Sequence, residues 1–163
     1  MFIRDYGFTQ ETERIALAAG PNGIKVLPHF RKQLADSAPE DRVKHAYNVW
    51  RIERKPDEFR ELFVQALGSK ESLQRYYAFN VISRTGEDAK FAVPKLLTLL
   101  GHQNATIVRQ SVSALVQVDP NSQTTIDAIK TLAANHQDKR VVTAAKKALT
   151  KMAKAERQQR RRD

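Results

Sequence analysis

The residue types that most often carry catalysis or bind metals are sparse in this chain. The sequence has no cysteine, no glycine-rich phosphate-binding loop, no GxSxG nucleophile elbow and no HExxH pair. Those are the spacings typical of phosphate, acyl-transfer and zinc sites. Without cysteine, disulfides and thiolate metal sites are excluded. We predict no catalytic residue, no metal ligand and no cofactor.

Two of the four histidines, His102 and His136, belong to a tripeptide that occurs twice. HQN at 102–104 recurs as HQD at 136–138, 34 residues later. On successive turns of a repeat these two rings would lie near each other, so a metal site or an acid–base pair is one interpretation. No set of carboxylates completes such a site, and a turn residue that recurs with a repeat explains the pair without chemistry. We therefore expect the two histidines to be turn residues.

A small aromatic cluster is the second candidate for chemistry. It consists of Trp50, Tyr76, Tyr77 and Phe79, and exposed aromatic rings can stack on a flipped or single-stranded base. Trp50 and Tyr77 stand near apolar positions, which favours a place in the core. Tyr76 and Phe79 are the better candidates for exposure.

Positive charge is concentrated at the C-terminal end. The formal net charge of the chain is +10. Residues 123–163 carry 11 basic and 4 acidic side chains, so this quarter of the chain supplies most of the excess. Electrostatic attraction to nucleic acid, an anionic surface or an acidic protein is expected to centre there.

The elements that must position these residues are helices, arranged in pairs. Apolar residues recur at helical spacing throughout, and no strand pattern occurs. In the most regular unit, Ala92–Val118, Gly101 ends a first helix and Asn104 caps a second. Helix pairs are also expected at 23–50, 56–84 and 124–157, after a short capping helix at Thr9–Ala19. Ser37 with Glu40 has the spacing of a capping box, and Pro28 predicts a kink or a late start.

The pairs recur with a period of 32 to 34 residues. AYNVW at 46–50 matches AFNVI at 78–82, and positions 80–81 correspond to 114–115 and 148–149. A period of this length made of two helices is typical of an α-solenoid, in which each unit buries its apolar face against its neighbours. We predict an all-α fold: an α-solenoid of about four two-helix units in a single domain over residues 1–156. The basic segment 157–163 is expected to be a disordered tail.

The unit at Ala92–Val118 resembles the HEAT and HEAT-like repeat family. Its first helix has the family's proline and leucine-rich face, and its second has the valine–arginine and alanine–leucine pairs; the matching residues are Pro94, Leu96, Leu97, Leu99, Leu100, Val108, Arg109, Ala114 and Leu115. The resemblance implies a binding scaffold, with enzymes such as alkylpurine DNA glycosylases as a minority. It also implies that Arg109, and Arg75 at the equivalent position, bond carboxylates or turn carbonyls, although arginine also suits phosphate.

The outward faces of the second helices are the predicted binding surface, because in solenoids such a row lines a continuous surface. Tyr47, Phe79 and Ser113 are also assigned to this outward row. The lysines on these faces are equally consistent with a face that only contacts solvent and keeps the protein soluble. The predicted partner-binding residues are Lys44, Arg51, Tyr76, Gln110, Gln117, Lys139, Arg140, Lys147, Lys151 and Lys154.

Three functions fit this sequence. The leading hypothesis is a non-enzymatic scaffold that binds an acidic protein or, as the alternative partner, nucleic acid. The rival is a DNA-acting enzyme of the glycosylase type, which needs a carboxylate facing the cleft; Glu53 and Asp57 are the nearest in sequence. The third is a subunit that packs through exposed solenoid ends, which leaves the oligomeric state open. The chain has no apolar run long enough to span a membrane and no secretory signal at its start, so a soluble, cytoplasmic protein is expected.

Overall fold

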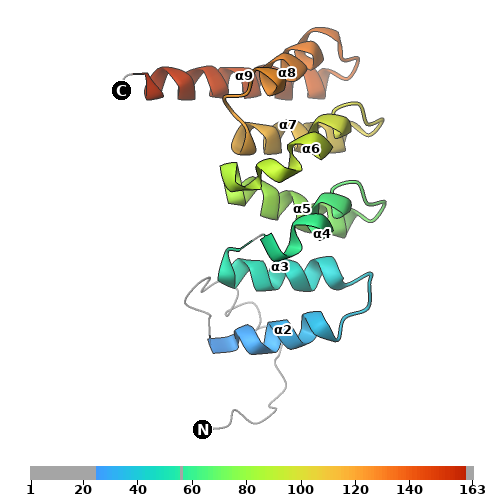
Figure 1. Cartoon of the computed structure of the whole chain (residues 1–163). Coiled ribbons are helices and arrows are strands. Elements are labelled where there is room, and N and C mark those ends of the chain that lie inside the picture. Colours follow the sequence, from blue (N-terminus) through green and yellow to red (C-terminus); the bar gives the residue numbers. More distant parts are fainter. Residues whose placement is uncertain (1–24, 56, 161–163) are drawn as a thin grey trace. The chain divides into compact units, whose positions relative to one another are not determined.

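The computed structural model describes residues 25–55 and 57–160. Every regular element within these ranges is a helix (Figure 1), which confirms the all-α class. Contacts cluster in two compact units, unit 1 (Met1–Phe59) and unit 2 (Arg60–Asp163), which we describe separately. The single domain over residues 1–156 stays a prediction. The capping helix expected at Thr9–Ala19 lies outside the described residues.

Unit 1 contains α2 (Leu27–Ala35), α3 (Arg42–Glu53) and the 3-10 turn η2 (Asp57–Phe59). Pro28 stands in the first turn of α2, where its missing N–H is not needed, so the predicted late start is confirmed. Helices α2 and α3 pack on each other. Their shared core includes Phe30 and Trp50, which are both almost fully buried.

An arginine ties the three elements of unit 1 together. Arg31 Nη2, on α2, lies 2.7 Å from Glu53 Oε2 on α3 and 2.9 Å from Glu58 Oε2 on η2. The hydrogen bond from Arg31 lowers the pKa of Glu58 below its ordinary value, because it stabilises the charged carboxylate. Glu53, one of the two carboxylates considered for catalysis, is therefore held in a structural ion pair.

The capping box predicted at Ser37 is wrong. The Ser37 hydroxyl donates to the carbonyl of Leu34, 2.7 Å away, at the C-terminal end of α2. Helix α3 begins only at Arg42, with Asp41 as its N-cap residue. The Ser37 hydroxyl therefore bonds the end of α2 instead of capping the next helix.

Unit 2 is built from three successive helix pairs. Their elements are α4 (Arg60–Ala66) and α5 (Ser72–Thr85); the 3-10 segment η3 (Gly86–Ala92), α6 (Val93–Leu99) and α7 (Ala105–Val118); and α8 (Gln123–Asn135) and α9 (Lys139–Gln159). Each first helix packs on the second helix of its own pair, and α5, α7 and α9 pack in a row (Figure 1). The chain thus shows sequential helix packing.

The last helix is longer than the sequence predicted. Helix α9 continues to Gln159, so residues 157–159, assigned to the start of a disordered tail, are helical. Arg160 bonds Glu156 one turn earlier, with 2.6 Å between Arg160 Nη2 and Glu156 Oε1. Residues 161–163 lie outside the described ranges. No helix in the described part of the chain has the length and the apolar composition needed to cross a membrane.

Gly86, at the junction of α5 and η3, has a backbone conformation that favours glycine. Its φ of 67° and ψ of −137° are accessible to glycine and costly for residues with a side chain. We expect Gly86→Ala to lower the free energy of unfolding by about 1–3 kcal/mol, measured by urea denaturation.

Gly101 supplies the matched control for this change. It has no positive φ, and an added Cβ would make only an ordinary contact, 3.7 Å from the carbonyl oxygen of Thr98. Gly101→Ala should therefore change the free energy of unfolding by less than about 1 kcal/mol. Equal effects of the two substitutions would contradict the backbone explanation.

Candidate partner-binding surface

The second helices α7 and α9 begin with the same turn. The amide N–H of Asn104 donates to His102 Nδ1 over 2.9 Å, and that of Asp138 donates to His136 Nδ1 over 3.0 Å. The side chains of Asn104 and Asp138 then accept from the amide two residues further on. An N-cap of this kind satisfies a helix N–H that would otherwise lack a partner. The turn fixes where each second helix starts.

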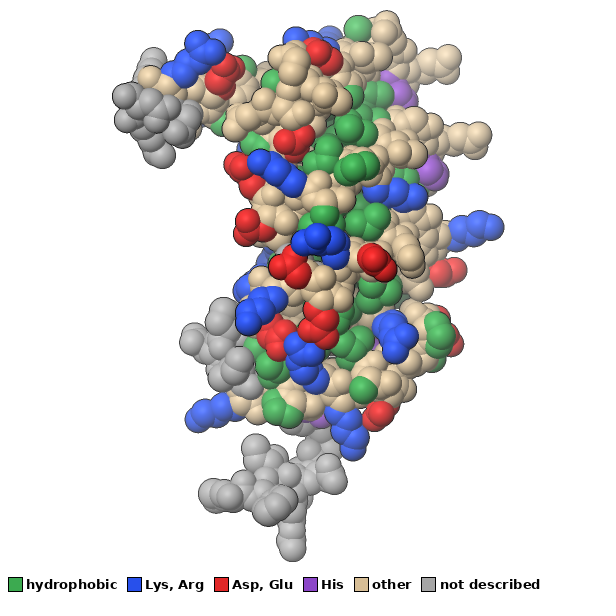
Figure 2. All heavy atoms as spheres, in the orientation of Figure 1, with side chains coloured by type: hydrophobic (Ala, Val, Ile, Leu, Met, Phe, Trp, Pro, Cys, Tyr) green, Lys and Arg blue, Asp and Glu red, His purple; other side chains and the backbone are tan. Residues whose placement is uncertain are grey.

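These contacts support the structural interpretation of the two histidines, because both ring nitrogens Nδ1 accept bonds from the turn backbone. Figure 2 shows histidine side chains at the edge formed by the α6–α7 and α8–α9 turns. Within the described residues, no three His, Asp or Glu side chains come together as a set of metal ligands.

The cap of α9 also fixes an arginine. Arg140 Nη2 lies 2.7 Å from Asp138 Oδ2. This side-chain hydrogen bond and the bond from the Arg140 amide hold the pKa of Asp138 far below its usual range, because both stabilise the carboxylate. The charge of Arg140 is therefore largely balanced by its neighbour, and its contribution to an outside anion is smaller than that of an unpaired cation.

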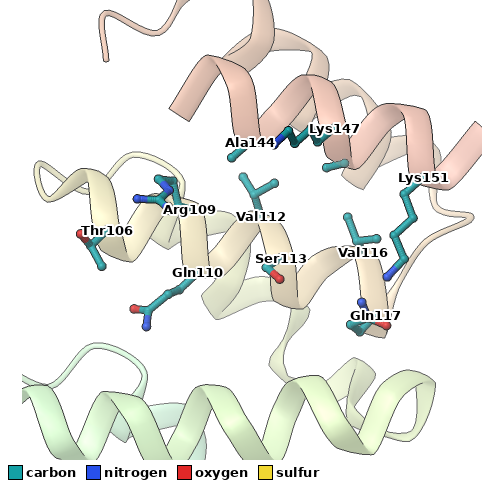
Figure 3. Close-up of a pocket in the computed structure, with 11 residues that line it drawn as sticks. Thr106, Arg109, Gln110, Val112, Ser113, Val116, Gln117, Ala144, Lys147 and Lys151 are labelled. Atoms are coloured by element: carbon teal, nitrogen blue, oxygen red, sulfur yellow. The ribbon is translucent and has the colours of Figure 1, made fainter. Parts of the chain in front are cut away.

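A groove of about 530 Å³ runs between α7 and α9. Figure 3 shows the residues that line this groove. Gln110, Ser113 and Gln117 lie on α7 and project away from α9. Val112 and Val116 point from α7 towards α9, and Lys151 extends from α9 towards the end of α7 near Gln117. The groove has an aliphatic floor with cations beside it. The residues that line it are Thr106, Arg109, Gln110, Val112, Ser113, Val116, Gln117, Ala144, Lys147, Ala148 and Lys151.

Two smaller hollows extend this groove in unit 2. One, of about 450 Å³, adds Lys139, Arg140 and Thr143 at the beginning of α9 and shares Arg109, Ala144 and Lys147 with the groove. The other, of about 240 Å³, adds Tyr76, Phe79, Asn80, Ser83 and Arg84 from α5 and shares Gln110 and Ser113. The three hollows thus form one continuous surface on α5, α7 and α9, which we call the second-helix surface.

The second-helix surface carries charge of one sign. Among the residues that the structure describes, none of those lining its three hollows is acidic. Arg109, Lys147 and Lys151 make no hydrogen bond or ion pair with any residue that the structure describes. By contrast, the face of unit 2 in Figure 2 carries acidic side chains interspersed with basic ones. An anion in the groove would meet unpaired cations and no like charge.

The two repeat-equivalent arginines differ. Arg75 Nη1 donates to the carbonyl oxygens of Ser69 and Lys70, each 2.7 Å away, so its predicted structural role is found. Arg109 is exposed and lines the groove without such an acceptor among the described residues. The structural role predicted for Arg109 is therefore not seen.

The structure brings together most of the residues predicted for partner binding. Gln110, Gln117, Lys147 and Lys151 line the groove itself. Lys139, Arg140 and Tyr76 line the adjoining hollows, with Tyr76 50% exposed.

The other three predicted residues lie elsewhere. Lys154 is exposed on α9 but lines none of these hollows. Lys44 and Arg51 lie on α3 in unit 1, so the candidate surface is defined for unit 2 alone.

Two aromatic residues predicted to face outward are buried. Tyr47 is 8% exposed and stacks on Trp50, with 6.0 Å between ring centroids. Phe79 is only 6% exposed, although it is one of the residues that line the α5 hollow. For Phe79 the reason is that α5 packs on α4, η3 and α7, which buries a wider arc than one apolar face. Trp50, as predicted, is core.

Sequence reasoning missed the floor of the groove. Val112 was assigned only to the apolar face of its helix and Val116 was not singled out, yet both line the groove. They are spaced four residues apart, as Lys147 and Lys151 are on α9. That matched spacing on two successive second helices was present in the sequence.

In comparisons with known proteins, no family model, curated protein or solved structure matches this chain.

Proposed function

We propose that this chain is a HEAT-like helical-repeat scaffold of the α-solenoid type that binds an anionic partner on its second-helix surface. The repeated architecture is supported by the three successive helix pairs of unit 2 and by the His–Gln–Asx turns 34 residues apart. Stacked repeats present a continuous surface that suits an extended partner. The last helix pair is the electrostatic anchor.

One observation carries the binding function: Arg109, Lys147 and Lys151 line a groove that contains no acidic side chain. Cations without a partner among the described residues attract an outside anion more strongly than paired ones do. The aliphatic floor strengthens this attraction, because it lowers the local dielectric around an anion bound against it. A merely solvated lysine face would not need a hollow beneath it.

The test is a charge reversal of the groove, Lys147→Glu with Lys151→Glu. The probe is fluorescein-labelled poly-L-glutamate, titrated at low salt and followed by fluorescence anisotropy. We expect the variant to bind about tenfold more weakly, because each exposed charge contact is worth up to about 1 kcal/mol and reversal adds repulsion. Circular dichroism should show unchanged helicity.

The matched control is Lys70→Glu with Lys146→Glu. Both lysines are exposed and line none of the three hollows, so net charge changes equally while the groove stays intact. The affinity of this variant for poly-glutamate should stay within about twofold of that of the unaltered protein. The change in net charge acts only through long-range attraction, which salt screens. If both double variants lose affinity equally, the attraction is to net charge and the proposed site is wrong.

The glycosylase alternative gains no specific support. It needs a carboxylate facing the basic cleft to activate water or stabilise a cationic sugar. Among the described residues, no carboxylate lines the hollows of the second-helix surface. Glu53, one of the two candidates, is paired with Arg31 in unit 1. The aromatic platform is reduced to Tyr76, since Phe79 is buried.

A further inference from the structure

Little apolar side-chain surface is exposed on the second-helix surface. Val112 and Val116, the aliphatic floor of the groove, are 1% and 7% exposed, and Phe79 is buried as well. Apart from Tyr76, the only apolar residue that is not buried, among the described residues lining the three hollows, is the half-buried Ala144. Interfaces between proteins have an apolar core, whereas protein–DNA interfaces are more polar and more positively charged. The surface therefore fits a nucleic acid better than an acidic protein.

Unpaired cations stand on all three second helices. They are Arg84 on α5, Arg109 on α7, and Lys139, Lys147 and Lys151 on α9. None of them has a side-chain hydrogen bond or ion pair with a residue that the structure describes. Packed helices have axes about 8–10 Å apart, so α5 and α9 are separated by about 16–20 Å. A stacked strand covers this distance with about five or six nucleotides at about 3.4 Å each. Such a strand has phosphates beside cations of each helix.

The side chains between the cations are uncharged and can form hydrogen bonds. Gln110, Ser113 and Gln117 project from α7 away from α9 (Figure 3). Gln110 and Ser113 also line the α5 hollow. An amide side chain carries both donors and an acceptor, and so do the edges of nucleic-acid bases. In a duplex those edges are paired or lie within the grooves, but in a single strand they are open to a protein. The α7 residues therefore suit a single strand.

Tyr76 offers an aromatic ring at the α5 end of this surface. It is 50% exposed and contacts Tyr77 edge to face, with 5.5 Å between the ring centroids. Asn80 lines the same hollow and donates from Nδ2 to the Tyr76 carbonyl oxygen over 3.0 Å, so its Oδ1 remains to accept a bond from a base. Proteins that bind single strands combine a cationic groove with aromatic rings on which bases stack. Both parts are present on the second-helix surface.

We infer that the second-helix surface binds a single-stranded nucleic acid, with its phosphates at the unpaired cations and one base stacked on Tyr76. This inference rests on the proposed function and names the class of its anionic partner. Recognition then depends on the bases of the partner as well as on its charge.

The experiment measures the binding of fluorescein-labelled ten-residue probes to the full chain at low salt by fluorescence anisotropy. The probes are oligo(dT), oligo(U), a strand with the backbone of oligo(dT) but without bases, and deca-glutamate. Oligo(dT) or oligo(U) should bind about tenfold more tightly than the strand without bases, because stacking on an aromatic ring adds to the phosphate contacts. Deca-glutamate should bind more weakly than either. The tighter of the two oligonucleotides identifies DNA or RNA as the partner.

Three variants separate stacking from charge. Tyr76→Ala should lower the affinity for the base-containing oligonucleotides about tenfold and leave that for deca-glutamate within about twofold, because only the bases stack on the ring. Tyr76→Phe keeps the ring and should keep the affinity within about twofold. Leu73→Ala is the matched control, because Leu73 is exposed on the same helix and lines none of the three hollows. Circular dichroism should show the same helicity for all three.

Three outcomes would overturn the inference. They are equal affinity for strands with and without bases, equal effects of Tyr76→Ala and Leu73→Ala on oligonucleotide binding, and tighter binding of deca-glutamate than of either oligonucleotide, which would identify an acidic protein as the partner. In each case the proposed anion-binding function stands as long as poly-glutamate binding falls on charge reversal of Lys147 and Lys151. If poly-glutamate binding does not respond to that reversal, the proposed function itself is wrong.

Discussion

Leu115→Ala is expected to lower the free energy of unfolding of unit 2 by about 3–5 kcal/mol. Leu115 is fully buried on α7, the helix that packs on α5, α6 and α9. Truncation removes the transfer free energy of the lost carbons and leaves a cavity that helices held on several sides cannot close. Urea denaturation followed by circular dichroism would measure the loss as a lower midpoint at an unchanged slope.

The same substitution on the surface of unit 2 provides the control. Leu73, on α5, is 65% exposed. Leu73→Ala removes the same atoms without opening a cavity, so its effect should stay within about 0.5 kcal/mol. If Leu73→Ala destabilised unit 2 as much as Leu115→Ala, α7 would not be the centre of the packed core.

The positions of the helices in unit 2 could be predicted because their signals are local. Asn104 caps α7 by a bond within two residues, and Gly86 ends α5 by its own backbone conformation. Such features depend on near neighbours in the sequence, and periodic apolar residues fill the helices between them. The capping box predicted at Ser37 is wrong because the Ser37 hydroxyl bonds the carbonyl of Leu34 at the end of α2.

The faces of the helices were harder to predict. Assigning one apolar stripe to the core assumes that a helix is buried on one side only. Helix α5 packs against three other elements, so Phe79 is buried although it stands outside the main stripe. Which side of a helix remains exposed to solvent depends on the other elements that pack against it. The spacing of residues along that helix carries no information about those contacts.

The exposure of charged residues at the candidate site could be predicted from the sequence. The shape of the groove, and which residues line it, could not. Lysines on a surface helix stay exposed almost wherever the helix packs, and Lys147 and Lys151, predicted from the sequence to face outward, line the groove. Arg109 was assigned the role of Arg75 because the two positions are equivalent in the repeat. Arg109 instead lines the groove, which the equivalence of the two positions in the sequence does not predict.

Trp50→Ala should destabilise unit 1 by about 3–5 kcal/mol. Trp50 is 1% exposed, stacks on Tyr47 and has the Arg54 guanidinium 4.8 Å above its ring centroid. Removing the indole therefore opens a large cavity and also ends an aromatic contact and a cation–π contact. Because Trp50 is the only tryptophan, its fluorescence reports the unfolding of unit 1 in the unaltered chain. For the variant, hydrogen exchange of the α3 amides measures the loss.

Two further substitutions on α3 separate burial from helix propensity. Lys44→Ala replaces an exposed residue of the same helix and should leave amide exchange within α3 nearly unchanged. Trp50→Phe keeps an aromatic ring in the core, so exchange should be intermediate between that of Trp50→Ala and the unaltered chain. Protection of α3 that survives Trp50→Ala would mean that the packing of α2 on α3 does not depend on the indole.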